Sequence, residues 1–489
     1  MQTVEIVVPE TDGRRSTSAL GRAVVADALA GADPVGSRAA LRETDWRRGY
    51  AAHFVRLVEA GLQSESAALE IAHDGLASLH ARMCATVRDD GAPDQVHDVP
   101  LDELFGTSFD LPRLETGTVQ GTSDPERELT IPFKGDRLRG DALVRQLDAW
   151  VEAGSMEPSA AQAVRTVADH PDWLAMPGRR LVVLGASAEM GPLRAVLRWG
   201  VEVIALDLPR PHVWRDVLDM AAASAGTLHV PVKGAAPRLA DRAGADLLVN
   251  LPGVATWLEG FEGNLVLGNY VYADGSTNLR VSAAVDALTT RLLGERGDVA
   301  LGFLATPTDV FAVPAEVVDF SNRAYEKRKL RYIRPVVRAL SAGRLLRRNY
   351  APRPAPGIND SIVTQQGPNY ILAKRLQRWR ASAARQAGAE VSLNVAPPTR
   401  TRSVLKNRAL AAAYAGAHRF GVEVFAPSTS NTLMAALLVH DLYSGVAVPS
   451  EPWRAEAHDA VHGGLWRGPY SPRSALGIAA ALGIGSART

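Results

Sequence analysis

The stretch of residues 180–207 constrains the fold of this chain more than any other. Residues 181–184 read Leu-Val-Val-Leu, an apolar run typical of a buried parallel strand. Gly185 follows that run, and apolar residues then recur at helical spacing through 193–199. A second apolar run fills 201–206. The sequence therefore predicts a strand, a glycine turn, a helix and a second parallel strand in succession.

The turn after the first strand reads Gly-Ala-Ser-Ala-Glu-Met-Gly from Gly185 to Gly191. Glycines at such a turn let a pyrophosphate approach the backbone where a helix begins. Asp207 ends the second strand about 20 residues later, at the place where a carboxylate binds ribose hydroxyls. We therefore expect a dinucleotide at this turn. The other residues expected to contact it are Ser187 and Met190.

Glu189 fills the position of the middle glycine in this turn. A carboxylate beside a pyrophosphate repels it unless the side chain points away. S-adenosylmethionine, another nucleotide or a purely structural role for the unit therefore stay open at this point.

Strands and helices continue to alternate along the rest of the chain. Apolar runs at 227–232, 246–250, 298–305 and 391–395 are expected to be strands, and 281–293 is expected to be a helix. The expected strand at 246–250 ends in Asn250 and a turn at Gly253. This alternation predicts an α/β fold with a doubly wound parallel sheet, which is Rossmann-like. Ligands of such sheets bind beyond the carboxyl ends of the strands.

The chain is long enough for more than one domain. Residues 1–175 are expected to form a mostly helical N-terminal region without a recognisable catalytic group. Residues 176–448 are expected to hold the sheet, with an insertion at 309–367, and 449–489 to form a tail. The tail is rich in Trp, Gly and Pro and could fold back on the sheet or on a second copy, so a homo-oligomer stays open.

Composition narrows the expected partners and location. The formal net charge is only +1, which disfavours a nucleic-acid or membrane-surface role. The single cysteine, Cys84, excludes an intrachain disulfide and a multi-cysteine metal site, and no metal is expected. The sequence shows no signal peptide and no apolar run of about 18 residues. We therefore expect a cytoplasmic enzyme with a small-molecule substrate. The Ala- and Arg-rich composition is typical of bacterial enzymes.

Tyr370 and Lys374 are spaced to share one face of an expected helix that runs to about residue 387. An ammonium near a phenol favours phenolate and so lowers the phenol's pKa. A phenol tuned in this way can exchange a proton with a carbonyl or alcohol oxygen. A half-buried tyrosine with a surface lysine is the structural alternative, because this spacing is common by chance.

The region from about 180 to 445 resembles the short-chain dehydrogenase/reductase family. The turn at Gly185–Gly191 is similar to that family's cofactor turn, and Asp246 to Gly253 to its Asn-Asn-Ala-Gly motif. Tyr370 and Lys374 match its tyrosine–lysine pair. The residues that match its catalytic asparagine and serine positions are Asn278 and either Thr306 or Thr308.

The resemblance implies hydride transfer between NAD or NADP and a carbonyl or alcohol carbon. Tyr370 would be the acid and base, and Lys374 would lower its pKa. Thr306 or Thr308 would bind the substrate oxygen, and Asn278 would support a proton relay. Asp207 slightly favours NAD, whereas nearby Arg210 could bind the 2′-phosphate of NADP. The insertion and the N-terminal region imply a lid over a bulky substrate.

The chain also departs from the family pattern. Glu189 replaces a glycine, and threonine replaces the serine unless Ser361 supplies that hydroxyl. The insertion separates the fifth strand from the Tyr370 helix. The first alternative is therefore a nucleotide-binding or scaffold protein that has lost catalysis. The second is a methyltransferase that uses S-adenosylmethionine, in which Tyr370 and Lys374 would have no role.

Overall fold

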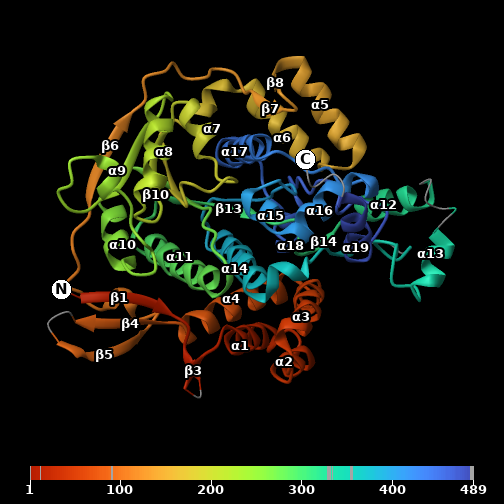
Figure 1. The fold of residues 1–489 in the computed structure, drawn as a ribbon, viewed down its shortest axis with the longest axis horizontal. Helices are drawn as coiled ribbons and strands as arrows, with labels where there is room; N and C mark the ends of the chain where they lie inside the picture. Colours follow the sequence, from red (N-terminus) through yellow and green to blue (C-terminus); the bar gives the residue numbers. More distant parts are fainter. Residues whose placement is uncertain are drawn as a thin grey trace.

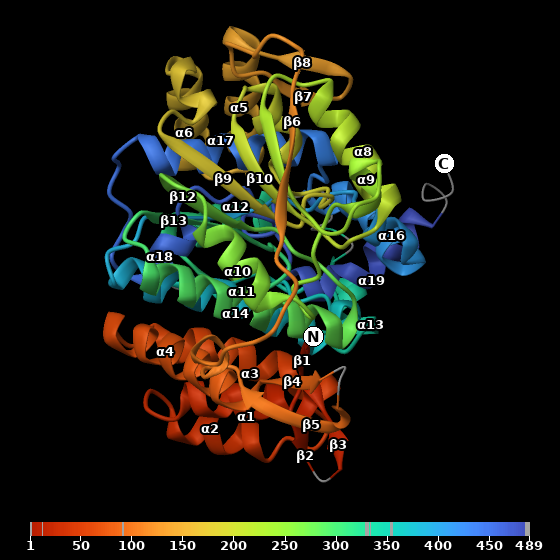
Figure 2. The same cartoon turned by 90° about the vertical axis from the view of Figure 1, so that its left-hand side faces the viewer.

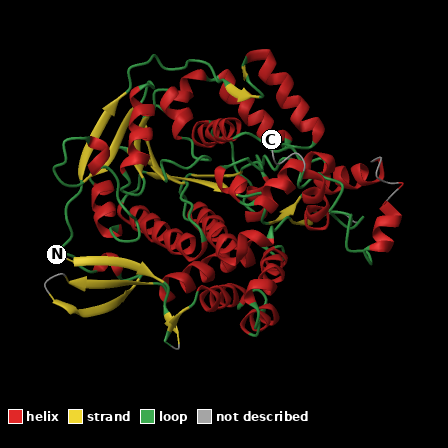
Figure 3. Cartoon of the chain, viewed as in Figure 1, coloured by secondary structure: helices red, strands yellow, loops and turns green. Residues whose placement is uncertain are grey.

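A seven-stranded sheet runs through the middle of the computed structural model, which describes residues 2–11, 13–89, 92–327, 332, 334–352 and 356–484 (Figures 1 and 3). Its strand order is β16-β13-β12-β9-β10-β11-β6. The first six are mutually parallel, and only β6 is antiparallel to its neighbour. The strands are β6 (Glu115–Gln120), β9 (Arg179–Leu184), β10 (Glu202–Leu206), β11 (Thr227–Val232), β12 (Asn264–Asn269), β13 (Val299–Ala305) and β16 (Val391–Val395).

The order of the six parallel strands is that of a doubly wound, Rossmann-like sheet, so the predicted α/β class is confirmed at that level. The direction of winding reverses between β9 and β12, which is where ligands of such sheets bind. Leu181 to Leu184 are buried because helices cover both faces of β9, as their uninterrupted apolar pattern predicts.

One face of the sheet carries three helices and, beneath them, the first hundred residues (Figure 2). The three helices are α10 (Leu251–Glu259), α11 (Gly275–Glu295) and α14 (Gly367–Gln386). The layer beneath contains α1 (Thr17–Leu29), α2 (Pro34–Leu41), α3 (Trp46–Gly61), α4 (Glu65–Arg82) and the antiparallel strands β1 (Gln2–Val7), β4 (Cys84–Asp89) and β5 (Ala92–Pro100). A short hairpin joins β2 (Glu10–Thr11) to β3 (Arg14–Arg15).

The opposite face is covered by helices from both the N-terminal region and the sheet region, which share one apolar core. These helices are α5 (Gly140–Ala153), α6 (Pro158–Asp169), α7 (Leu193–Arg198), α8 (Pro211–Ala222) and α17 (Pro427–Tyr443). The hairpin of β7 (Ile131–Phe133) and β8 (Asp136–Leu138) lies beside α17, and α9 (Leu239–Arg242) lies beside α8. The N-terminal region therefore contributes to both faces, and its strand β6 forms one edge of the main sheet.

The insertion and the tail meet at the carboxyl end of the sheet, beyond β13 and β16 (Figure 1). The insertion contains a hairpin of β14 (Val310–Val313) and β15 (Gly357–Asp360), with α12 (Ala315–Lys327) and α13 (Arg334–Leu340) between them. After β16 come α15 (Arg402–Lys406) and α16 (Arg408–Gly416), and the tail adds α18 (Pro452–Ala457) and α19 (Pro472–Gly483). Helix α19 packs on α16, so the tail folds back on its own chain.

The sequence prediction of a strand at 246–250 is wrong, because these residues form a turn. The Asp246 side chain accepts the backbone N–H of Leu248 (2.9 Å), and the carbonyl of Asp246 accepts that of Asn250 (2.9 Å). This turn curls the backbone and leads directly into α10, with Pro252 in the first turn of that helix. The fourth parallel strand is instead β12, whose short Asn-Leu-Val-Leu-Gly-Asn sequence was not recognised.

In the part of the chain that the structure describes, no helix combines the length and the apolar character that crossing a membrane requires.

Candidate functional site

The glycine turn, defined as Gly185 to Gly191, lies beyond the end of β9. Gly185 has a φ of +89°, and a Cβ there would lie 3.0 Å from the carbonyl oxygen of Tyr270. The amides of Gly185 and Ala186 both donate to the carbonyl of Leu206 at 2.9 Å. Only glycine fits this backbone and this spacing, so the turn is fixed against the ends of β10 and β12.

Asp207 lies at the mouth of this turn, as expected. Its Oδ2 accepts the amide of Ser187 (2.7 Å), and its Oδ1 accepts the amide of Leu208 (2.8 Å). Each carboxylate oxygen has a further lone pair, so the group can still accept hydrogen bonds from a sugar. Met190 is half-buried against the core, and the amide of Gly191 donates to Ala188 within the turn.

Glu189 turns toward the segment that follows β16. Its carboxylate accepts the amide of Arg402 (2.7 Å) and lies 3.3 Å from that residue's Nε. The side-chain amide of Asn431 donates to the carbonyl of Glu189 (3.3 Å). The carboxylate charge is therefore balanced by Arg402 at the start of α15, and this contact joins α15 to the glycine turn.

Asn250 and Gly253 begin α10 and do not follow a strand, unlike the sequence prediction. Asn269 is the residue that ends the fourth parallel strand. It is buried, and its Oδ1 has no hydrogen-bond partner among the described residues. Tyr270, the next residue, packs beside Gly185, so this strand end and the glycine turn are in contact.

Tyr370 and Thr306 are brought together from α14 and from the end of β13. The Thr306 hydroxyl is close enough to the Tyr370 phenol to lower its pKa, and Thr306 Oγ1 lies 2.9 Å from Thr308 Oγ1. Thr308 in turn donates to Oε1 of half-buried Gln366 (2.9 Å). We call these four residues the hydroxyl chain. Because Thr308 has one proton and gives it to Gln366, Thr306 donates to Thr308.

Lys374 does not act on Tyr370 in the expected way. Its ammonium donates to the carbonyl of Leu304 (3.0 Å) and to Gln377 (3.1 Å). Burial raises the pKa of Tyr370, and the neighbouring Thr306 hydroxyl acts in the opposite direction. Burial also lowers the pKa of Lys374 to about 8.

Asn278 holds the loop that follows β12. It is buried in the first turn of α11, and its Oδ1 accepts the amide of Ala273 (3.0 Å). The ring of Tyr272 in that loop lies edge-on to Tyr370, with the ring centroids 6.2 Å apart. Asn278 therefore positions the loop beside Tyr370 through its backbone contact.

An ion network of four buried or nearly buried side chains lies below Tyr370 on α14. Arg378 pairs with Asp309 (2.7 Å) and with Glu456 of α18 (2.5 Å), and Arg375 lies 3.2 Å from Asp309. Asp309 is wholly buried and directly follows the threonines of the hydroxyl chain. The network thus fixes the strand end, α14 and the tail relative to one another, and the Asp309 charge helps to raise the pKa of Tyr370.

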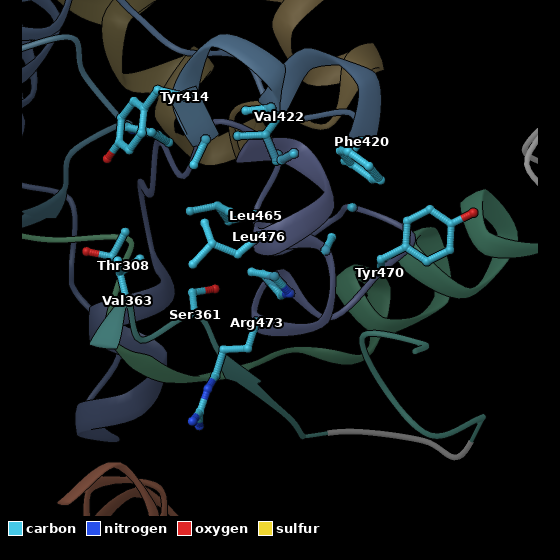
Figure 4. Close-up of a pocket in the computed structure, with 18 of the residues that line it drawn as sticks. Thr308, Ser361, Val363, Tyr414, Phe420, Val422, Leu465, Tyr470, Arg473 and Leu476 are labelled. Atoms are coloured by element: carbon cyan, nitrogen blue, oxygen red, sulfur yellow. The ribbon is translucent and has the colours of Figure 1, made fainter. Parts of the chain in front are cut away.

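An apolar cavity that opens to solvent adjoins the hydroxyl chain (Figure 4). Thr308, Ser361 and Tyr414 lie on one side of it, Phe420 and Tyr470 on the other, and Leu465 and Leu476 between them. The Arg473 guanidinium points away and pairs with Asp360 (2.6 Å). Ser361 donates to Asn359, so it lines the cavity without joining the hydroxyl chain. Tyr414, whose pKa burial raises, is close enough to Tyr370 for the two phenols to interact electrostatically.

No protein-family model matches this chain, and none of the curated proteins does.

Several residues of the site were not identified from the sequence. Gln366, Tyr414 and Asp309 come from three separate segments, and none belongs to a pattern with a recognisable spacing. The one available signal was Thr306-Pro-Thr-Asp309, a polar group directly after a buried strand and so at the ligand-binding edge of the sheet.

Proposed function

We propose that this chain is an NAD(P)-dependent oxidoreductase that acts on a carbonyl or alcohol carbon of an apolar substrate. The observation that supports this most is the position of the Tyr370 and Thr306 hydroxyls. They lie close together at the carboxyl edge of a doubly wound sheet, and Thr308, which is bonded to Thr306, lines an apolar cavity. A proton donor next to an apolar site suits the reduction of a ketone or aldehyde.

The glycine turn fits the phosphate part of a dinucleotide in several respects. Its backbone is left-handed at Gly185, it meets the end of β10, and Asp207 retains free lone pairs for ribose hydroxyls. The Glu189 carboxylate is bound by Arg402, so its negative charge repels a phosphate in the turn less than a free carboxylate would. A nicotinamide bound there would supply or accept the hydride.

The residues of the hydroxyl chain have definite proton roles in this proposal. Tyr370 gives its proton to the substrate oxygen, and Thr306 holds that oxygen or the phenol in place. The phenolate left on Tyr370 is stabilised when Thr306 turns its hydroxyl to donate to it and Thr308 turns to donate to Thr306; a proton taken up from solvent then restores the phenol. Gln366 completes the reversal by presenting its NH₂ group in place of its carbonyl, because an amide offers both a donor and an acceptor.

The cavity supports an apolar substrate. Its walls are mostly aliphatic and aromatic side chains, with Thr308 and Ser361 as polar groups on the side that also carries Tyr414. A carbonyl placed at Thr306 would therefore extend its hydrocarbon part toward Leu465 and Leu476. Small, polar carbonyl compounds would leave this space unfilled and are expected to be poorer substrates.

The proposal is tested in two stages. NADH and NADPH are first titrated against the protein by fluorescence, and aliphatic and aromatic ketones of increasing size are then screened for turnover. On the best ketone, Tyr370→Phe is expected to lower kcat about 10²- to 10⁴-fold. Its affinity for the nicotinamide should stay unchanged, because Tyr370 is outside the glycine turn.

The matched control is Tyr443→Phe, a half-buried tyrosine whose hydroxyl donates to the carbonyl of Pro177 at the opposite end of the sheet. It should keep full turnover. Equal losses in the two variants, or an unchanged kcat in Tyr370→Phe, would contradict the assigned role of Tyr370.

A nucleotide-binding protein without turnover is the second candidate, and α7 favours it. That helix spans only Leu193–Arg198, so it offers a weaker dipole to a pyrophosphate than a long helix would. Nicotinamide binding without turnover on any ketone would support this alternative. Binding of S-adenosylmethionine in place of either nicotinamide would support a methyltransferase.

A further inference from the structure

Three polar side chains from two segments converge beside β16, away from Tyr370. They are His440 and Asp441, near the end of α17, and Asp459, just after α18. One ligand atom from each lies within 4.8 Å of those of the other two. We call these residues the His–Asp cluster. His458 adjoins it, with its Nδ1 3.1 Å from Oδ1 of Asp459.

His440 is the unusual member of the cluster. It is only 6% exposed, and its Nδ1 makes no hydrogen bond with the described residues. That nitrogen faces two carboxylates, lying 3.5 Å from Oδ1 of Asp441 and 3.8 Å from Oδ2 of Asp459. Both separations are too long for good hydrogen bonds, and a buried ring nitrogen is rarely left without a partner.

The separations match those of atoms that share a metal ion. Nitrogen and oxygen ligands bind zinc at about 2.1 Å, so two ligands in tetrahedral positions are about 3.4 Å apart. Octahedral magnesium would bring neighbouring oxygens to about 3.0 Å and prefers an all-oxygen site. The geometry and the histidine therefore favour zinc.

Neighbouring side chains hold the carboxylates of the His–Asp cluster by hydrogen bonds, as is common around metal ligands. Oδ2 of Asp441 accepts the hydroxyl of Ser392 (2.6 Å) and the amide of Asn394 (2.7 Å), which turns Oδ1 toward His440. Asp459 is 3% exposed, and its own amide donates to Ser159 (3.0 Å). The Arg385 guanidinium donates to the carbonyl of Val391 and lies close enough to Asp441 for the two charges to attract each other.

We infer that His440, Asp441 and Asp459 bind one divalent cation of the zinc class, with His458 or water as a further ligand. Asp441 reaches Ser392 of β16 from α17, which covers the face of the sheet opposite α14, so the cation and Tyr370 lie on different sides of the sheet. The cation would fasten α17 to the segment after α18. That segment continues into Gly464, Leu465 and Gly468 of the apolar cavity. The site is therefore structural and independent of the proposed oxidoreductase activity.

Metal analysis of protein purified without an affinity tag tests this inference. We expect about one zinc ion per chain, loss of that zinc to a strong chelator, and a lower Tm afterwards. Adding zinc back should restore the Tm, because an ion that binds only the folded chain stabilises it. Manganese and magnesium are tested in parallel and should restore less.

Variants locate the ion. His440→Gln and Asp459→Asn should each weaken zinc affinity at least about 100-fold, and Ser392→Ala by about 10-fold because it only orients Asp441. His80→Gln is the control, since His80 forms a complete buried pair with Asp286 (2.6 Å) and should keep its zinc. If His440→Gln does not fold, the zinc affinity of Ser392→Ala and the Tm of the wild type after zinc is added back still test the inference. Absence of metal together with an unchanged Tm on adding zinc, or zinc retained equally in all variants, overturns the inference.

Discussion

The glycine turn and the Tyr370 segment lie at the same edge of the sheet, but different interactions hold them in place. The turn is fixed by backbone hydrogen bonds between Gly185, Ala186 and the carbonyl of Leu206, all from one short stretch of sequence. The Tyr370 segment is fixed by buried ions from the segment after β13, from α14 and from the tail. Local geometry thus defines the proposed cofactor side, and charge pairing between distant segments defines the proposed substrate side.

The largest effect should come from the ion network. Asp309→Asn leaves Arg375 and Arg378 buried with only part of their partners, and breaking a buried pair costs roughly 3–5 kcal/mol. Denaturant unfolding should show this loss. Asp148→Asn is the control, because Asp148 is 66% exposed in its pair with Arg165 and should cost less than about 1 kcal/mol. Equal costs would mean that the network does not stabilise the substrate side.

A smaller loss is expected from the turn itself. Gly185→Ala places a Cβ 3.0 Å from a carbonyl oxygen in a left-handed backbone, which should cost roughly 1–3 kcal/mol. Gly178→Ala shares the positive φ (+74°) but meets no atom within 4 Å. Gly185→Ala should therefore weaken nicotinamide binding in a titration, whereas Gly178→Ala should reduce only the free energy of unfolding. Weakened binding in both variants would point to a general loss of structure.

The difference between local and long-range interactions also explains which parts of the structure could be predicted from the sequence. The strands at 181–184, 201–206, 227–232, 298–305 and 391–395 and the helix that carries Tyr370 were predicted and are confirmed, because each has its own apolar period. The apolar run at 246–250 was wrongly predicted to be a strand, because the Asp246 side chain stabilises a turn there. Tyr414, Gln366 and Asp309 could not be grouped, because only folding brings their segments together.

A second buried ion site should make the tail sensitive to acid. Burial acts to raise the pKa of Glu157, but hydrogen bonds from Arg467 and His462 outweigh it and lower the pKa to about 2. The unfolded carboxyl titrates near 4.5, so the unfolded chain binds the extra proton between about pH 2 and 4.5. Stability from this group is complete above about pH 4.5 and is lost as pH falls toward 2.

Glu157→Gln measures this contribution directly. Its free energy of unfolding should be lower than that of the wild type at pH 6, and the difference should shrink as pH falls below about 4.5. Denaturant titrations at several pH values give both quantities. A difference that is constant from pH 6 to pH 3 would show that the Glu157 carboxylate is not selectively stabilised in the folded state.

The smallest effect concerns Glu189, where the two rival functions differ most. Its carboxylate already accepts the amide of Arg402 and pairs with an Arg402 side chain that is 80% exposed. Glu189→Gln removes a charge that is largely balanced and screened, so nicotinamide affinity should change by no more than about five-fold. If the wild type binds no nicotinamide and Glu189→Gln binds it well, then Glu189 itself closes the turn. The protein would then be a scaffold whose glycine turn is structural, because the same contact that neutralises Glu189 also holds α15 over the site.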